Sequence, residues 1–255
     1  MKKRILFLIA LLFSSLHAQN DPINNNVEQI LAKSNIVSKD ISTAFLKNDV
    51  SHLWTKTPSN MIFGFFGSDN FQRLQIKILT VKRDKRNKAL YHVTGKNKRL
   101  GKVFDFKGTF EISRVYKTHD PEKENSNTGL IKGLYELFEN KIIANAGEFT
   151  GLFITYWYKD PKGSVCYDDL LGVTDDFNNN QFVGLWNSYK ARIACSCNWG
   201  DHRIPASGKL DVGAGEFCPD EKYEKYGWKN YSDAYLRQNE NSQKAKQIEL
   251  EEWWK

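Results

Sequence analysis

Four short segments of the chain repeat one pattern of apolar and small residues. Each has an apolar residue, a spacer, a glycine, a second spacer and an aromatic residue: Phe106/Gly108/Phe110, Ile131/Gly133/Tyr135, Phe149/Gly151/Phe153 and Phe182/Gly184/Trp186. Residues i, i+2 and i+4 of a strand share a face, so each copy places an apolar group, a gap and a ring on one side. The glycine leaves room for a neighbouring ring or strand and lets the strand bend, as a closing sheet requires.

Alternation of apolar and polar residues extends over much of the middle of the chain. It predicts strands over residues 71–81, 89–94 and 103–115, and an apolar run predicts a further strand over 148–158. The last of these is apolar on both faces, so another element must cover its outer surface. Residues 130–142 fit a helix as well as the repeated strand pattern. We interpret them as a strand, because an interior glycine costs a helix about 1 kcal/mol.

Helical patterns lie on both sides of this strand region. Residues 27–47 predict two short helices that cover an open end of a barrel. Pro219 and Gly227 bound a short helix, and residues 232–253 favour a longer one that packs on the outer face of 148–158. The predicted fold is mainly β, an antiparallel meander closing into a barrel or strongly curved sheet. Short N-terminal helices (19–60) precede the β domain (61–218), and a C-terminal helical segment (219–255) follows it.

The first 18 residues have the features of an export signal. Three basic residues precede the apolar run Ile5–Phe13, and small and polar residues follow up to Ala18. The run is too short for a stable membrane span, so we expect cleavage near Ala18 and export to the periplasm or beyond, a retained anchor being the alternative. Cleavage lowers the net charge from +7 to 7 − 3 = +4. This mildly basic mature chain indicates neither a transmembrane segment nor a nucleic-acid partner.

A run of basic residues accompanies the first strands. Between Lys82 and Lys102 the chain has nine basic residues and one acidic residue, Asp84. Hairpin turns are normally polar and solvated, which explains the run without a ligand. If these turns gather at one end of a barrel, they form a positive rim suited to an anionic lipid or glycan.

The chain has four cysteines, Cys166, Cys195, Cys197 and Cys218. An even number in an exported protein favours disulfides. A Cys195–Cys197 bridge would close a strained ring, so we expect Cys166 and Cys218 each to pair with one of these two. A zinc site that includes His202 is the alternative, which the spacing and the oxidising compartment disfavour. We predict no metal and no cofactor.

A glycine-rich segment near the cysteines contains charged groups with catalytic potential: Asp201, His202, Arg203, Asp211 and Glu216. A histidine among carboxylates can act as a general base, and paired carboxylates can act on a glycosidic bond. No nucleophile elbow, phosphate loop or His-Glu-x-x-His motif accompanies them. A structural role is therefore favoured. Asp and Asn residues between 168 and 180 do not have the spacing of an EF-hand calcium loop, and an Asx-rich turn explains them.

Gly184 and Trp186 resemble the Gly-x-Trp motif of lipocalins and the wider calycin group. In that group the motif lies in the first barrel strand, whereas here it lies near the end of the strand region. The resemblance implies a barrel with an apolar ligand cavity.

Three functional hypotheses follow from the sequence. The first is an exported, non-catalytic binding protein for an apolar or anionic ligand. Its interior would be lined by the rings of the repeated pattern, namely Phe106, Phe110, Tyr135, Phe153 and Trp186. The second is a secreted hydrolase using Asp201, His202, Asp211 or Glu216. The third is a packed barrel whose exposed surface carries the function.

Overall fold

The computed structural model describes residues 22–123 and 127–255. The predicted export signal lies outside the described residues. The strands are β1 (Ile62–Phe66), β2 (Gln72–Arg83), β3 (Leu90–Arg99), β4 (Lys102–Lys117), β5 (Asn127–Glu139), β6 (Gly147–Lys159), β7 (Val165–Tyr167), β8 (Asn179–Ser188) and β9 (Ala194–Asp201). The α-helices are α1 (Pro22–Lys33), α2 (Ser42–Phe45), α3 (Lys229–Tyr231) and α4 (Ser242–Glu249).

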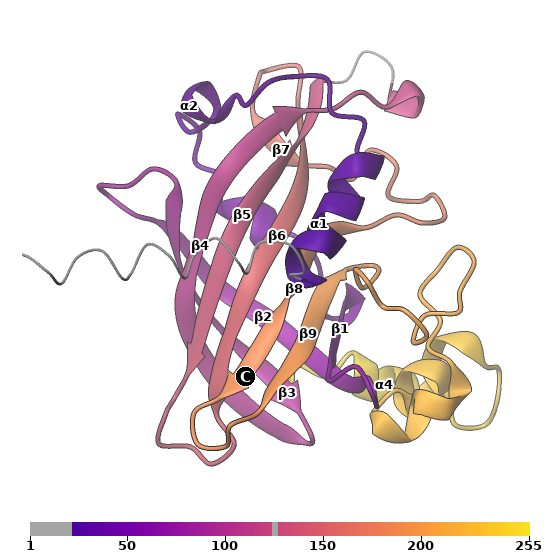
Figure 1. Cartoon of the computed structure of the whole chain (residues 1–255). Coiled ribbons are helices and arrows are strands. Elements are labelled where there is room, and N and C mark those ends of the chain that lie inside the picture. Colours follow the sequence, from indigo (N-terminus) through magenta and orange to yellow (C-terminus); the bar gives the residue numbers. More distant parts are fainter. Residues whose placement is uncertain (1–21, 124–126) are drawn as a thin grey trace, which may run out of the picture.

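Eight of these strands close into an antiparallel barrel (Figure 1). The strand order is β5-β4-β3-β2-β1-β9-β8-β6, and pairing of β5 with β6 completes the ring. Strand β7 lies outside the ring and pairs with β6 alone. The predicted fold class is confirmed. The ambiguous segment 130–142 is mostly strand, since β5 runs from Asn127 to Glu139.

The repeated glycine and ring pattern fills the barrel interior. Every ring of the pattern is at most 5% exposed, and Phe182 stacks on Trp199 with ring centroids 4.7 Å apart. A Cβ atom at Gly184 would lie 2.2 Å from the hydroxyl oxygen of Tyr135, and one at Gly133 would lie 2.3 Å from the ring of Phe153. The glycines therefore make room for rings on neighbouring strands, as the sequence predicts.

Helix α2 lies at the upper end of the barrel in Figure 1, and the segment between α2 and β1 leads down from it. Trp54, from the 3-10 helix Ser51–Trp54, enters the barrel and meets the rings of Tyr91 and Phe110 edge-on at 5.0 and 5.4 Å. Its Nε1 donates to Thr155 Oγ1 at 3.0 Å. The prediction that helices over 27–47 cover an open end is wrong for α1, which packs on the outer face of β6, and the ring that enters the barrel comes from Trp54, beyond that range.

A buried ion pair lies near the opposite, lower end. Arg99 donates to Glu139 through both Nη atoms, with Nη2 at 2.8 Å from Oε2. Glu139 also accepts hydrogen bonds from Asn97 Nδ2 and the backbone nitrogen of Gly147, both at 2.7 Å. Each charge has its partners, so burial of the pair leaves neither group unsatisfied.

The exposed basic residues do not form one rim. Strand β3 runs the length of the barrel, so the β2–β3 turn with Lys85 and Arg86 lies at the end opposite the β3–β4 turn with Lys102. Arg99 is 3% exposed and faces inward. Antiparallel topology therefore divides the basic run between the two ends.

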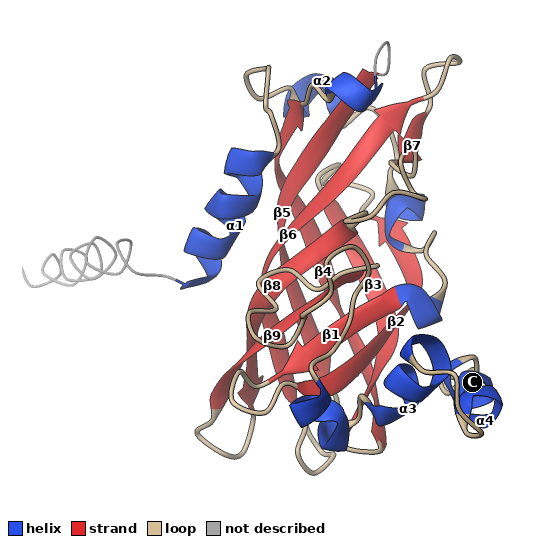
Figure 2. Ribbon diagram, turned by 90° about the vertical axis from the view of Figure 1, so that its right-hand side faces the viewer, coloured by secondary structure: helices blue, strands red, loops and turns tan. Residues whose placement is uncertain are grey.

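The outer apolar face of β6 is covered by α1, not by the C-terminal helix. Val27 of α1 is buried against Leu130, Ile154 and Val183. The C-terminal segment packs instead beside β1 and β2, where Arg73 pairs with Glu249 at 2.6 Å. Figure 2 shows α1 and the pair α3 and α4 on different sides of the barrel.

The predicted C-terminal helix over 232–253 is interrupted. A π-helical turn, Ser232–Leu236, continues α3, the chain becomes extended at Arg237, and α4 begins at Ser242. Ser242 Oγ donates to the backbone oxygen of Arg237 at 2.8 Å, and Asn239 Oδ1 accepts from the backbone nitrogen of Asn241 at 2.9 Å. These local bonds compete with the helix in a stretch that has no apolar residue to pack.

We expect Gly184→Ala to lower the free energy of unfolding by about 1–3 kcal/mol, because the new methyl group overpacks the core beside Tyr135. Urea unfolding of the variant measures the change. Gly172→Ala is the matched control, since its Cβ would meet nothing closer than 3.1 Å. Equal loss of stability in both variants would contradict the packing argument.

Candidate functional site

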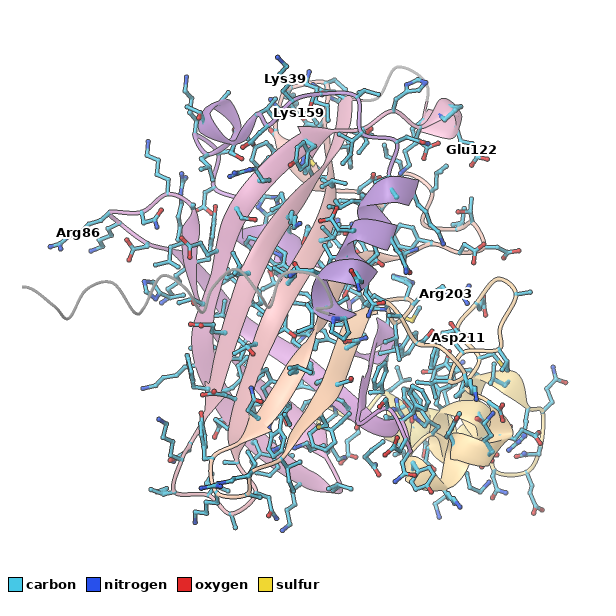
Figure 3. All side chains as sticks on the ribbon, in the orientation of Figure 1. Lys39, Arg86, Glu122, Lys159, Arg203 and Asp211 are labelled. Carbon is cyan, nitrogen blue, oxygen red and sulfur yellow. The ribbon has the colours of Figure 1, made fainter. Side chains whose placement is uncertain are left out.

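A cleft of about 360 Å³ lies outside the barrel, where β1 and the end of β9 meet the 172–177 loop and the C-terminal segment. Figure 3 labels Arg203 and Asp211 in this region, beside the C-terminal segment. The cleft is lined by Asn60, Met61, Phe63, Gly172, Val173, Thr174, Asp175, Asp176, Phe177, His202, Arg203, Gly215, Glu216, Phe217, Tyr231 and Tyr235.

Aromatic rings form much of the cleft wall. Phe63 stacks on Phe217 at 4.8 Å and meets Tyr231 edge-on at 5.1 Å. Tyr235 lies 5.1 Å beyond Tyr231, and Phe177 contacts the His202 ring at 4.8 Å. Phe217 is 1% exposed, whereas Tyr235 is 37% exposed. The inner rings thus fix the wall, and Tyr235 offers accessible ring surface.

Arg203 fastens the loop that shapes the cleft. Its Nη2 donates to Asp211 Oδ2 at 2.7 Å and to the Gly213 backbone oxygen at 3.0 Å. Its Nη1 donates to Asp176 Oδ1 and to the Gly215 backbone oxygen, both at 2.6 Å. All the polar contacts of the guanidinium named here are thus within the protein, and two carboxylates, Asp176 and Asp211, pair with its one positive charge.

Two further carboxylates at the cleft have no such partner. Asp175 and Glu216 are exposed, and within the described part of the chain neither makes a hydrogen bond or an ion pair. With Asp176 they supply three negative charges against the single positive charge of Arg203, so the lining carries a net charge of 1 − 3 = −2. The cleft is apolar in its wall and negative at its rim.

The structure separates the neighbours Asp201 and His202. Asp201 faces the barrel interior, where its Oδ2 accepts from Thr57 Oγ1 and Asn180 Nδ2 at 2.7 Å and from the Tyr167 hydroxyl at 3.0 Å. Burial raises the pKa of this carboxyl to about 7. His202 has a φ of 64° and lines the cleft, and burial lowers its pKa.

The charged residues singled out in the sequence therefore have different surroundings. His202, Arg203 and Glu216 line the cleft, Asp211 supports it through Arg203, and Asp201 is buried away from it. The cleft rings Phe177, Tyr231 and Tyr235 were missed, because only the fold brings their distant segments together. The role of the interior rings Phe106, Phe110, Tyr135, Phe153 and Trp186 as ligand contacts stays a prediction. None of these rings lines the external cleft.

The predicted disulfides are absent. All four cysteines are free and none lies within bonding distance of another. In the sheet, Cys166 lies opposite Tyr158 near the upper end of the barrel, and Cys195 lies opposite Trp186 toward the lower end. The side chain of Cys197 faces the interior. Cys218 lies in the loop of the cleft. The barrel thus holds the expected partners apart.

The acidic residues between 168 and 180 are also dispersed. Asp168 pairs with Lys123 at 2.9 Å, Asp176 pairs with Arg203, and Asn180 bonds to Asp201. Within residues 22–123 and 127–255, no group of three or more His, Cys, Asp or Glu side chains is placed to hold a metal ion.

The fold and site define a closed eight-stranded β-barrel with a filled interior and an external aromatic cleft. Comparisons with protein-family models, curated proteins and solved structures found no match. Among the described helices, none is long and apolar enough to cross a membrane.

Stability should depend on the protonation of Asp201. From about pH 4 to pH 7 the unfolded chain releases a proton that the folded protein keeps, so the free energy of unfolding falls as pH rises through this window. Asp201→Asn should remove this fall. Urea unfolding at pH 5 and pH 8 tests it, with the exposed Glu136→Gln as control. An unchanged pH dependence in Asp201→Asn would refute the assignment.

Thiol titration tests the cysteine assignment. In denaturant without reductant we expect four reactive thiols. In the folded protein Cys197 should stay unreactive, because it is fully buried and burial raises its pKa. A count of two or fewer thiols in denaturant would restore the disulfide hypothesis.

Proposed function

We propose that this protein is an exported, non-catalytic binding protein whose ligand occupies the external aromatic cleft. The ligand class is a small molecule that combines an apolar or aromatic body with a positive charge. The observation that carries the proposal is the combination of exposed ring surface with a net negative rim in one cleft. The export signal predicted over residues 1–18 supports the proposed location.

The shape of the cleft supports a small ligand. Its volume of about 360 Å³ falls in the lower part of the range of roughly 300–1,000 Å³ usual for ligand pockets. The rings of Phe63, Phe217 and Tyr231 contact one another and are nearly inaccessible to solvent, so the wall exists before a ligand arrives. A preformed wall lowers the ordering cost of binding.

The charges of the cleft support a cation. Asp175 and Glu216 are free to pair with a positive group, whereas Arg203 is already paired with Asp176 and Asp211. A cation over a tyrosine face gains roughly 0.5–1 kcal/mol at an exposed site. An anion would meet two unpaired carboxylates, so the cleft disfavours the anionic ligand expected from the basic run between Lys82 and Lys102.

A hydrolase has less support from the same geometry. Asp201 is buried in the barrel, and Asp211 accepts from Arg203 and from the backbone nitrogens of Gly213 and Cys218. Of the four residues of that hypothesis, the cleft contains His202 and Glu216. Glu216 is the one carboxylate of that hypothesis in the cleft lining, so these four residues do not bring two carboxylates to the cleft, as glycoside hydrolysis requires.

Binding can be tested with three probes that share a benzyl or phenyl ring. We expect benzyltrimethylammonium to bind more tightly than benzyl alcohol, and benzyl alcohol more tightly than benzoate, as measured by ligand-observed NMR titration. Glu216→Gln and Tyr235→Leu should each weaken binding of the cation by roughly two- to fivefold. Neither should change the affinity for benzyl alcohol by as much.

Glu251→Gln is the matched control, because Glu251 is exposed and lies outside the cleft lining. It should leave all three affinities unchanged. Preference for benzoate, or an equal effect of Glu251→Gln and Glu216→Gln, would overturn the proposal.

A further inference from the structure

Three hairpins end together at the lower end of the barrel (Figure 1). They are the β3–β4 turn at Leu100 and Gly101, the β5–β6 turn over residues 140–146, and the β8–β9 turn over residues 189–193. Because neighbouring strands are antiparallel, these three connections must lie at the end opposite the β2–β3 turn. We call them the basal turns.

Each basal turn exposes an aliphatic side chain. Leu100 is 66% exposed, Ile142 is 82% exposed and Ile193 is 58% exposed. Val103 and Ile143 beside them are also exposed, at 43% and 39%. Turn residues are usually polar, so an exposed aliphatic group on all three tips requires an explanation.

Basic residues accompany these aliphatic tips on every basal turn. They are Lys98 and Lys102 at the first turn, Lys141 at the second, and Lys190 and Arg192 at the third. The nearby acidic residues are the buried Glu139 and Glu249, Glu148 at the start of β6, Asp69 in the β1–β2 turn, and Asp105 of β4. Five basic residues thus outnumber the three acidic residues that are not buried.

The basal turns are held by contacts to the barrel and to one another. Arg99 Nη2 donates to the Asn145 backbone oxygen at 2.9 Å. The backbone nitrogen of Tyr189 donates to the Ala146 oxygen at 3.2 Å, and Lys141 Nζ lies 5.0 Å from the Tyr189 ring. The second and third turns are therefore fixed relative to each other, which lowers the cost of presenting their tips to a partner.

We propose that the basal turns dock the protein onto an anionic lipid bilayer. Separate aliphatic tips enter the boundary between headgroups and acyl chains, while the lysines and arginine between them contact lipid phosphates. Charge complementarity favours an anionic surface over a neutral one. Leu100, Ile142 and Ile193 lie in turns between strands and not along the part of β2 that β1 leaves unpaired, so these tips do not present a strand edge to a partner protein.

Vesicle sedimentation tests the docking surface. The full chain should bind vesicles of equal phosphatidylglycerol and phosphatidylcholine more tightly than vesicles of phosphatidylcholine alone, and added NaCl should weaken this binding. Ile142→Asp and Arg192→Glu should each reduce the affinity for the anionic vesicles by roughly tenfold.

Two variants serve as matched controls. Val173→Asp changes a fully exposed aliphatic residue in the 172–177 loop. Arg86→Glu reverses a charge at the β2–β3 turn, and Figure 3 shows Arg86 far from the basal turns. Both should bind anionic vesicles as the unchanged chain does. If either control weakens binding as much as its basal counterpart, the general charge or apolarity of the chain explains binding and the proposal is wrong.

In the full chain, the apolar run Ile5–Phe13 can itself bind vesicles. Amide hydrogen exchange separates this binding from docking by the basal turns, because it reports protection residue by residue. Anionic vesicles should slow exchange in residues 140–146 and 189–194, and leave residues 84–89 unchanged. If exchange in the basal turns is not slowed, the proposal is wrong, whether or not the vesicles bind the protein. That result is expected if the basal turns instead bind an acidic protein partner.

Discussion

Filling the interior of a closed eight-stranded barrel is the constraint on which the rest of this structure depends. Such a barrel encloses a space that side chains can just fill. Here large rings fill it, and they fit only because glycines on facing strands leave room, as Gly184 does for Tyr135. A barrel filled in this way offers its outer surfaces for recognition. The two surfaces proposed above accordingly lie outside the barrel.

Two clusters of buried polar groups, one near each end of the barrel, tie loops to strands. At the upper end, Asp201 joins Thr57 of the segment between α2 and β1 to Tyr167 of β7 and Asn180 of β8. At the lower end, Arg99 and Glu139 hold the β5–β6 turn through Asn145 and Gly147. Each cluster satisfies its buried carboxyl group with several hydrogen bonds, so the same groups stabilise the barrel and orient its loops.

The two proposed surfaces carry opposite charge. The external aromatic cleft has a net negative lining, whereas the basal turns are rich in lysine and arginine. Both consist of loops and hairpin tips held by a rigid barrel, the usual arrangement for binding sites on β folds. Their separation allows one surface to attach the protein while the other remains open to a small ligand.

The sequence by itself determined the strands and the class of fold, because alternation and glycine spacing act between residues close in the chain. It also predicted the end of the helical turn before Gly227, whose φ is 102°. The absence of disulfides, the covering of β6 by α1, and the meeting of Phe63, Phe177 and Tyr235 at one cleft were decided only by tertiary structure. These features depend on barrel closure, which sets distances between segments more than a hundred residues apart and leaves no local trace in the chain.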